Sequence, residues 1–297
     1  MTLKGRSLTG IGDLSDAEIV TILDTAAVYH HDLRAHSALL LDRIVAAAFY
    51  EPSTRTRLSF ETAAHRLGAS VVGFADASST SSVKGETLED TVHVLSGYGD
   101  LLVLRHPEQG AAARAAKVAS IPVINAGDGA GEHPTQTLLD LYTIRRSLGR
   151  LDGIQVAVMG DLRYGRTVHS LVPALQRLGA KVVQVPAPGL PLPGDIGAVP
   201  ELDLEEAAAS SDVLYVTRVQ KERMDATSNE AANRRLIVDG ALLARTGSEA
   251  IVMHPLPRVD EIAVDVDSLP SAKYFEQARN AVPVRMAVLA HLLGVVP

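Results

Sequence analysis

The feature that most constrains the fold is a regular alternation of short apolar runs with segments of helical spacing. Seven runs are expected to form buried strands: Ile44–Tyr50, Leu101–Arg105, Pro122–Asn125, Gln155–Met159, Lys181–Val185, Asp212–Thr217 and Ile251–His254. Helical spacing lies between them, as in the run from Leu138 to Arg145 and the run from Val168 to Leu178. This alternation predicts parallel sheets with helices on both faces, an α/β fold of the doubly wound type.

The chain is long enough for two domains, and Gly149–Gly153 is the best candidate for their boundary. Residues 1–149 are therefore expected to form the first domain and residues 150–279 the second. Near the N-terminus, Ser15 and Glu18 form the pattern of a capping box, which predicts a helix start. The Pro- and Gly-rich segment Pro186–Pro200 is expected to be a surface loop.

Composition excludes several kinds of site. The chain has no cysteine, so disulfides and thiolate metal sites are excluded, and a reducing cytoplasm is the expected location. The net charge of −7 argues against nucleic acid or an anionic membrane as partner. No apolar run reaches the length of a membrane span, and the first residues lack a signal-peptide pattern. We expect no metal and no cofactor: the turn at Gly160–Gly165 lacks G-x-G-x-x-G, and Arg166 stands where a phosphate-binding loop needs lysine.

Polar residues cluster directly after the predicted strands. The clusters are Ser53–Thr56, Arg105–Pro107, His133–Gln136, Arg163 with Arg166, Arg218–Gln220 and His254–Pro257. Ligands of open α/β sheets bind beyond the carboxyl ends of the strands. The clusters therefore predict a binding site rich in arginine and hydroxyl groups.

The segment Ser53–Arg57 opens a predicted helix and suits an anion. A helix N-terminus presents free N–H groups and partial positive charge, and the Arg55 fork matches a phosphate. Taken alone, this segment is better explained by a serine N-cap beside a surface arginine. Two hydroxyls and two arginines in so short a stretch favour the anion site.

Seven motifs in order resemble the aspartate and ornithine carbamoyltransferase family. They are Phe49–Glu61, Lys84–Thr87, Arg105–Pro107, His133–Gln136, Gly160–Thr167, Thr217–Arg223 and His254–Arg258. The resemblance covers most of the chain. It implies carbamoyl transfer from carbamoyl phosphate, as in pyrimidine biosynthesis when the acceptor is aspartate.

For carbamoyl phosphate, the resemblance implies a phosphate site, a carbonyl site and an amide site. The phosphate would be held by Ser53, Thr54, Arg55, Thr56 and Arg105. Thr56, Arg105 and His133 would contact the carbonyl oxygen, Gln136 the amide, and Leu256 would also reach this substrate. The groups implied in catalysis are Arg55, Thr56, Lys84, Arg105, His133 and Gln136.

For the acceptor, Arg166 and Arg218 suit two carboxylates because each can form bidentate pairs. By resemblance, Gln220 and the residues of a cis Leu256–Pro257 peptide would add contacts. Ser81 and Lys84 would reach the active site of a neighbouring subunit, which implies a homotrimer with shared sites. Glu51, Arg166 and Arg223 would form ion pairs that hold a closed form.

The resemblance also implies that a C-terminal helix, about residues 280–297, returns to the first domain, the one for carbamoyl phosphate, while the second domain binds aspartate. Arg279, Ala281 and Pro283 depart from the family's pattern at the start of that helix. Ornithine as acceptor is disfavoured, since the late motif is His254–Pro257 and no Ser-Met-Gly follows. A catalytically silent paralogue is the other alternative, and a regulatory chain or a dihydroorotase-like partner stays open.

Overall fold

The computed structural model describes residues 3–218 and 236–296. The chain divides into two compact units. Unit 1 comprises residues 1–142 and 280–297, and unit 2 comprises residues 143–279. The division therefore passes through two helices, α5 (Pro134–Leu148) and α9 (Tyr274–Leu293). In the described ranges, no helix is long and apolar enough to cross a membrane.

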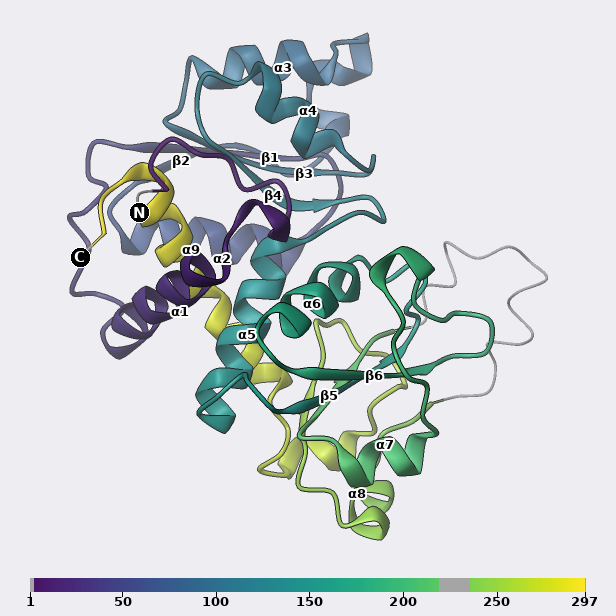
Figure 1. The fold of residues 1–297 in the computed structure, drawn as a ribbon. Coiled ribbons are helices and arrows are strands. Elements are labelled where there is room, and N and C mark those ends of the chain that lie inside the picture. Colours follow the sequence, from purple (N-terminus) through teal and green to yellow (C-terminus); the bar gives the residue numbers. More distant parts are fainter. Residues whose placement is uncertain (1–2, 219–235, 297) are drawn as a thin grey trace. The chain divides into compact units, whose positions relative to one another are not determined.

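Unit 1 is built on a parallel sheet with strand order β2-β1-β3-β4. The strands are β1 (Ile44–Phe49), β2 (Ser70–Phe74), β3 (Leu101–His106) and β4 (Val123–Asp128). One face is covered by α3 (Leu88–Ser96) and α4 (Ala111–Val118), whose apolar side chains join those of β1 and β3 in one core. On the opposite side lie α1 (Asp16–His31), α2 (Thr54–Arg66) and α9, as Figure 1 shows.

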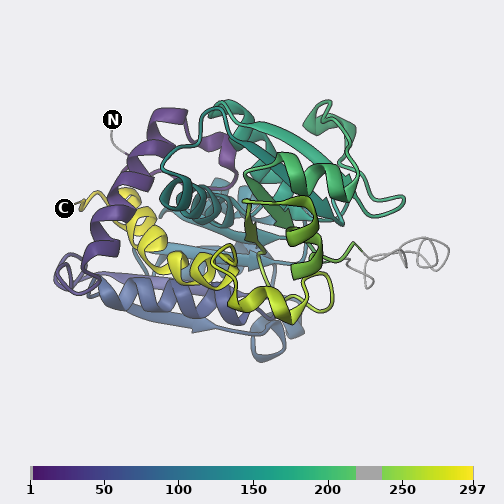
Figure 2. The ribbon, with the colours of Figure 1, turned by 90° about the horizontal axis from the view of Figure 1, so that it is seen from below.

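The C-terminal helix α9 packs against α1 and α2 of unit 1 (Figure 2). Thr25 Oγ1 of α1 lies 2.9 Å from His291 Nε2 of α9, and Arg285 of α9 donates to Ser59 of α2. This return of the helix was expected. Its start was not: α9 begins at Tyr274 instead of near residue 280, and Pro283 lies inside it.

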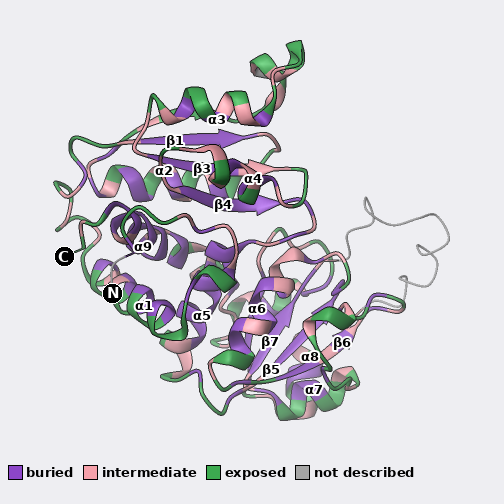
Figure 3. Ribbon diagram, turned by 45° about the horizontal axis from the view of Figure 1, so that its top comes forward, coloured by how far each residue is buried: buried purple, intermediate pink, exposed green. Residues whose placement is uncertain are grey.

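Unit 2 repeats the same architecture with strand order β6-β5-β7-β8, again parallel throughout. The strands are β5 (Gln155–Gly160), β6 (Lys181–Pro186), β7 (Val213–Val216) and β8 (Ile251–Met253). Helix α6 (Arg166–Arg177) lies on one face, and α7 (Leu204–Ser210) and α8 (Gly240–Thr246) lie on the other (Figure 1). Strands β5, β7 and β8 are almost entirely buried, whereas the edge strand β6 is only partly buried, and Figure 3 shows β5 and β7 mostly in the buried colour.

All seven expected strands are confirmed to within a few residues, and so is the capping box of α1, in which Ser15 and Glu18 exchange hydrogen bonds. Strand β2 was missed. It is an edge strand whose residues are half-buried or exposed, and Gly73 interrupts its apolar pattern, so the sequence carries no continuous buried run there. Short 3-10 helices lie at Ile11–Asp13, Ala77–Ser79, Ser81–Lys84, Gly194–Ile196 and Val264–Ser268.

Gly160 allows β5 and β7 to approach closely at their carboxyl ends. Its φ is 106°, and a Cβ there would lie 2.2 Å from the carbonyl oxygen of Thr217. Gly160→Ala should lower the free energy of unfolding by about 2–4 kcal/mol, because alanine is strained at this positive φ and its Cβ overpacks the strand ends. Urea unfolding followed by circular dichroism measures this loss.

The matched control is Gly153→Ala. Gly153 is also left-handed, at φ 72°, but an added Cβ meets no atom within 4 Å. The Gly153→Ala variant should lose only about 1 kcal/mol of unfolding free energy. Equal losses for the two variants would contradict the close approach at Gly160.

Candidate functional site

In unit 1, polar side chains gather where α2 begins. Ser53 precedes the helix, and within the described chain its side chain makes no capping hydrogen bond. Thr54 and Arg55 are exposed, whereas Thr56 is buried. Burial of part of its side chain lowers the pKa of the Arg55 guanidinium, which is still charged at neutral pH. The first turn therefore offers backbone N–H groups, hydroxyls and a cation together, as an anion site requires.

Arg105 lies at an irregularity of β3, where the register with β4 shifts between Leu104 and His106. Such a bulge redirects a side chain out of the regular pleat. The guanidinium is fixed on two sides: Nη1 donates to the carbonyl oxygen of Ala126 at 3.1 Å, and Nη2 lies 2.6 Å from Glu51 Oε1. Glu51 directly precedes the α2 turn, so the carboxylate occupies a place suited to an anion.

The first turn of α5 adds His133 and Gln136. Both are buried, and His133 Nε2 lies 3.5 Å from Thr56 Oγ1, which links the starts of α5 and α2. Gln136 Nε2 donates to Asp140 Oδ1 at 2.9 Å, one turn further along the helix. Because this bond uses one amide hydrogen, it holds the amide plane of Gln136 in one orientation.

Ser81 and Lys84 lie away from these groups in sequence, on the 3-10 helix Ser81–Lys84. Both are exposed. Thr80 caps this helix, and Gly85 ends it with φ 91°. Hydrogen bonds thus hold the segment that carries Ser81 and Lys84 in a defined conformation.

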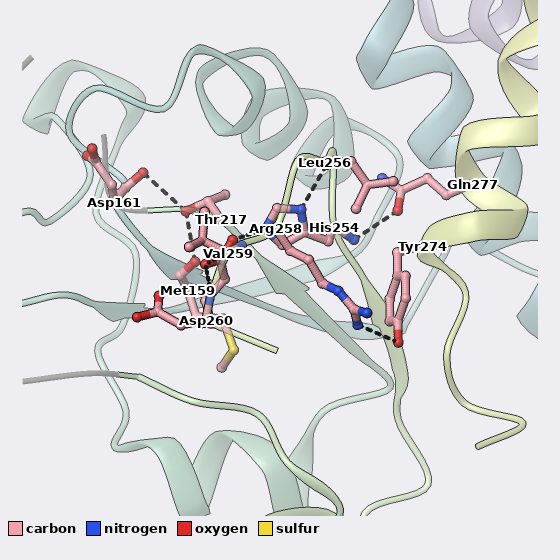
Figure 4. Close-up of polar contacts among 11 residues, drawn as sticks. Met159, Asp161, Thr217, His254, Leu256, Arg258, Val259, Asp260, Tyr274 and Gln277 are labelled. Carbon is pink, nitrogen blue, oxygen red and sulfur yellow. Dashed lines mark hydrogen bonds and ion pairs between the residues drawn. The ribbon is translucent and has the colours of Figure 1, made fainter. Parts of the chain in front are cut away.

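In unit 2, the ends of β5 and β7 are tied together by Thr217. Its Oγ1 donates to the carbonyl oxygen of Met159 at 2.9 Å and is 3.2 Å from that of Asp161 (Figure 4). Arg218 follows this tie and Arg166 begins α6 just after β5, each half-buried. The two arginines expected to bind carboxylates therefore follow adjacent parallel strands of one sheet.

The turn after β8 presents Leu256. Leu256 has a positive φ of 55°, rare for a branched side chain, and its peptide bond to Pro257 is cis, as the resemblance implied. The backbone N–H of Leu256 donates to His254 Nδ1 at 2.8 Å, and the N–H of His254 donates to Gln277 Oε1 at 2.9 Å (Figure 4). These bonds fix the backbone conformation of the turn on either side of Pro255.

Glu261 completes the support of this turn. Since His254 Nδ1 accepts from Leu256, the ring proton is on Nε2, which lies 2.7 Å from Glu261 Oε1. The other carboxylate oxygen accepts from the N–H groups of Val259 and Asp260 at 3.2 and 3.1 Å. Burial alone would raise the pKa of Glu261, but the hydrogen bonds from His254 and the backbone outweigh it and lower this pKa.

Arg258 is held on the far side of the turn. Its Nη2 lies 2.6 Å from Asp267 Oδ2, its Nη1 is 3.1 Å from the Tyr274 hydroxyl, and its guanidinium stacks over the Tyr274 ring at 5.1 Å. Bonds to the Asp267 carboxylate raise the pKa of Arg258 further. This cation is thus engaged in shaping the turn.

The structure brings Ser53, Thr54, Arg55, Thr56, Arg105, His133 and Gln136 into unit 1, and Arg166, Arg218, Leu256 and Pro257 into unit 2. Gln220 and Arg223 lie outside the described residues. Glu51, for which ion pairs with Arg166 and Arg223 were expected, has Arg105 as a partner; the expected pairs stay a prediction because Arg223 is outside the described residues. Sequence reasoning missed Asp140 and Glu261. The spacing of Asp140, four residues after Gln136 on one helix, was the available signal.

Fold and site together define a class: a protein of two parallel α/β units, each presenting arginines at the carboxyl ends of its strands. Residues 6–146 match the carbamoyl-P binding domain, and residues 152–292 the Asp/Orn binding domain, of aspartate/ornithine carbamoyltransferases. The chain belongs to this family. It is 48% identical over 303 residues to the aspartate carbamoyltransferase catalytic subunit of Thermoplasma acidophilum, covering 98% of this chain and 99% of that one. With the same subunit from Chromobacterium violaceum, identity is 48% over 300 residues, covering 97% and 98%.

Solved structures agree. Aspartate transcarbamoylase from Trypanosoma cruzi in complex with N-(phosphonacetyl)-L-aspartic acid is similar with a TM-score of 0.92 and 43% identity, covering 98% of this chain and 97% of that chain. The catalytic subunit of M. jannaschii aspartate transcarbamoylase gives a TM-score of 0.89 and 47% identity, covering 97% and 98%.

Glu261→Gln should destabilise the protein in a pH-dependent way. A carboxyl group whose pKa is lowered by folding contributes stability above its unfolded pKa, near 4.5, and loses it as pH falls through the folded pKa. At pH 7 the variant should be less stable by about 1–2 kcal/mol, the worth of hydrogen bonds to a charged group. That deficit should shrink as the pH falls below 4.5 toward the lowered pKa of the folded state, through which the wild-type carboxylate becomes protonated.

Urea unfolding from pH 8 down to pH 3 measures the deficit. Glu249→Gln, at an exposed position, serves as control and should show no such trend. A Glu261→Gln deficit that stays constant over this range would contradict the low pKa.

Proposed function

We propose that this protein transfers the carbamoyl group of carbamoyl phosphate to the amino group of L-aspartate, giving N-carbamoyl-L-aspartate and phosphate. One observation carries the proposal: in unit 1, Thr56 of α2 and His133 of α5 lie 3.5 Å apart, beside an α2 turn that bears Arg55. A helix N-terminus for phosphate and two neighbouring donors for one oxygen are what carbamoyl phosphate requires.

The phosphate would bind the first turn of α2 through Ser53, Thr54, Arg55 and Thr56, with Arg105 completing the site. Arg105 supports this role because its Nη1 is anchored on Ala126 while its Nη2 faces the Glu51 carboxylate. A phosphate oxygen can replace that carboxylate without moving the guanidinium. Charge-assisted bonds from several donors would then hold the dianion.

The carbamoyl group would lie between α2 and α5. Thr56, Arg105 and His133 would donate to its carbonyl oxygen, and Gln136, oriented by Asp140, would contact its amide. Donors held in place before reaction stabilise the oxyanion as the tetrahedral intermediate forms. Leu256 would reach the same substrate through its carbonyl.

Aspartate would bind through unit 2. Arg166 and Arg218 each offer a fork for one carboxylate, with Gln220 and Pro257 as further contacts. The Leu256 carbonyl, in a turn held by the bond from the Leu256 N–H to His254, would accept from the amino group and aim it. This arrangement suits an acidic acceptor and gives no reason to prefer ornithine.

The amine would attack the carbamoyl carbon directly and form the new C–N bond, and the C–O bond to phosphate would then break as the tetrahedral intermediate collapses. No covalent enzyme intermediate is required. Orienting two bound reactants can lower a barrier by roughly 7–11 kcal/mol in favourable cases. We propose the departing phosphate as acceptor of the amine proton.

Assembly is a separate part of the proposal. Ser81 and Lys84 are exposed on a shaped 3-10 helix, which suits insertion into a neighbouring subunit's site, and a homotrimer would complete three such sites. A regulatory chain or a dihydroorotase-like partner could join this trimer. The absence of cysteine supports a location in the reducing cytoplasm.

The activity predicts N-carbamoyl-aspartate from carbamoyl phosphate and L-aspartate, and no product from L-ornithine. Arg55→Ala should lower kcat/KM at least about 100-fold, because a charged donor is lost from the phosphate site. Chromatography of the products identifies the acceptor that is used, and the rate of product formation gives kcat/KM for the wild type and the variant. Citrulline from ornithine would overturn the acceptor, and carbamoyl phosphate binding without turnover would favour a silent paralogue.

Shared sites predict rescue between inactive variants. Arg55→Ala and Lys84→Ala homotrimers should each be nearly inactive. After subunit exchange, mixed trimers should regain activity, since some sites combine an intact Arg55 from one subunit with an intact Lys84 from its neighbour. Exchange shown by native mass spectrometry, with no regained activity, would refute sharing.

A further inference from the structure

The largest fully buried side chain of the described residues is an arginine. Arg285 lies in α9 within unit 1 and is only 2% exposed. Removing a guanidinium from water is expensive, and an apolar side chain of similar length fills such a place with less penalty. A cation at this depth therefore needs an explanation beyond packing.

The contacts of Arg285 lead to the first turn of α2. Nη1 donates to Ser59 Oγ, and Cζ lies 4.6 Å from the centre of the Phe60 ring. Ser59 Oγ in turn bonds the carbonyl oxygen of Arg55 and lies 3.1 Å from that of Thr56. Arg285 thus supports, through one hydroxyl, the two residues of α2 proposed to hold the phosphate and the carbonyl oxygen.

The charge of Arg285 also acts on α5 and β3. Burial and, after it, the nearby Arg105 lower the pKa of its guanidinium, and Asp140 opposes them; the pKa is about 9, so the group is still a cation at neutral pH. Asp140 is fully buried and accepts from Gln136. The cation therefore stabilises the carboxylate that orients Gln136 and raises the potential around Arg105.

We propose that Arg285 is a positioning residue for carbamoyl phosphate: it holds the Ser59 turn of α2, and its charge stabilises the Asp140 carboxylate that orients Gln136 of α5. It touches neither substrate. Its positive charge favours a dianion bound above it, because the repulsion between Arg285 and Arg105 is relieved when phosphate neutralises Arg105. This inference rests on the proposed function and deepens it.

The test compares Arg285→Lys and Arg285→Met by calorimetric binding of carbamoyl phosphate and inorganic phosphate, alongside steady-state kinetics. If Arg285 positions the site, the affinity for carbamoyl phosphate should fall from the wild type to Arg285→Lys and fall again to Arg285→Met. Arg285→Met should weaken carbamoyl phosphate binding roughly 10- to 100-fold, the range found for residues that support ligands at metal sites. The KM for aspartate should change much less.

A purely structural role predicts a different pattern. The Arg285→Met variant would then bind carbamoyl phosphate at least as tightly as the Arg285→Lys variant. Alternatively, any loss of affinity would run parallel to a fall in melting temperature. Either result overturns the proposal. Arg285→Met with Asp140→Asn removes both buried charges but keeps an oxygen for Gln136. This double variant should fold and remain weak in binding, and full recovery of affinity would also overturn the proposal.

Arg43→Met is the matched control. Arg43 forms an exposed pair with Asp100 at 2.6 Å and precedes β1, so it lies at the opposite edge of the sheet from the site. Its binding and kinetics should stay within about twofold of wild type. A wild-type protein that binds carbamoyl phosphate but transfers nothing would refute the proposed function alone, since the binding order of the Arg285 variants is measured without an acceptor.

Discussion

Parallel pairing of the strands directs every functional loop of a unit to one edge. In a parallel sheet all carboxyl ends lie together, and each strand end leads into a loop or helix start whose polar groups need partners. Unit 1 places Thr56 and Arg105 there, and unit 2 places Arg166 and Arg218. The hydrogen bonds that shape these edges, such as Thr217 to Met159 and Leu256 to His254, are local to them.

Much of this arrangement could be predicted from the sequence. Strands buried on both faces leave a continuous apolar run, and polar residues directly after such a run mark the carboxyl edge. The segment Ser53–Arg57 was identified in this way, and the structure places it at the start of α2. Long, strongly patterned elements and the helix starts beside them are therefore accessible without coordinates.

Other features left no local signal. Strand β2 is an exposed edge and lacks a buried run. Arg285 stands in the C-terminal helix that the resemblance implied, and nothing near it in sequence reveals that its partner is Ser59, far away along the chain. The Asp140 and Glu261 carboxylates acquire their roles only from groups brought to them by folding. Long-range partners of buried polar groups are what the sequence alone conceals.

Unit 1 is assembled from both ends of the chain, and this sets an order for its folding during synthesis. A ribosome releases residues 1–142 first, then the whole of unit 2, and only at the end the residues from 280 onward that complete unit 1. Unit 2 can therefore close while unit 1 still lacks the C-terminal part of α9. Until those residues emerge, the surfaces of α1 and α2 that will receive this helix are uncovered, and this interval is when the nascent chain is most exposed to association with other chains.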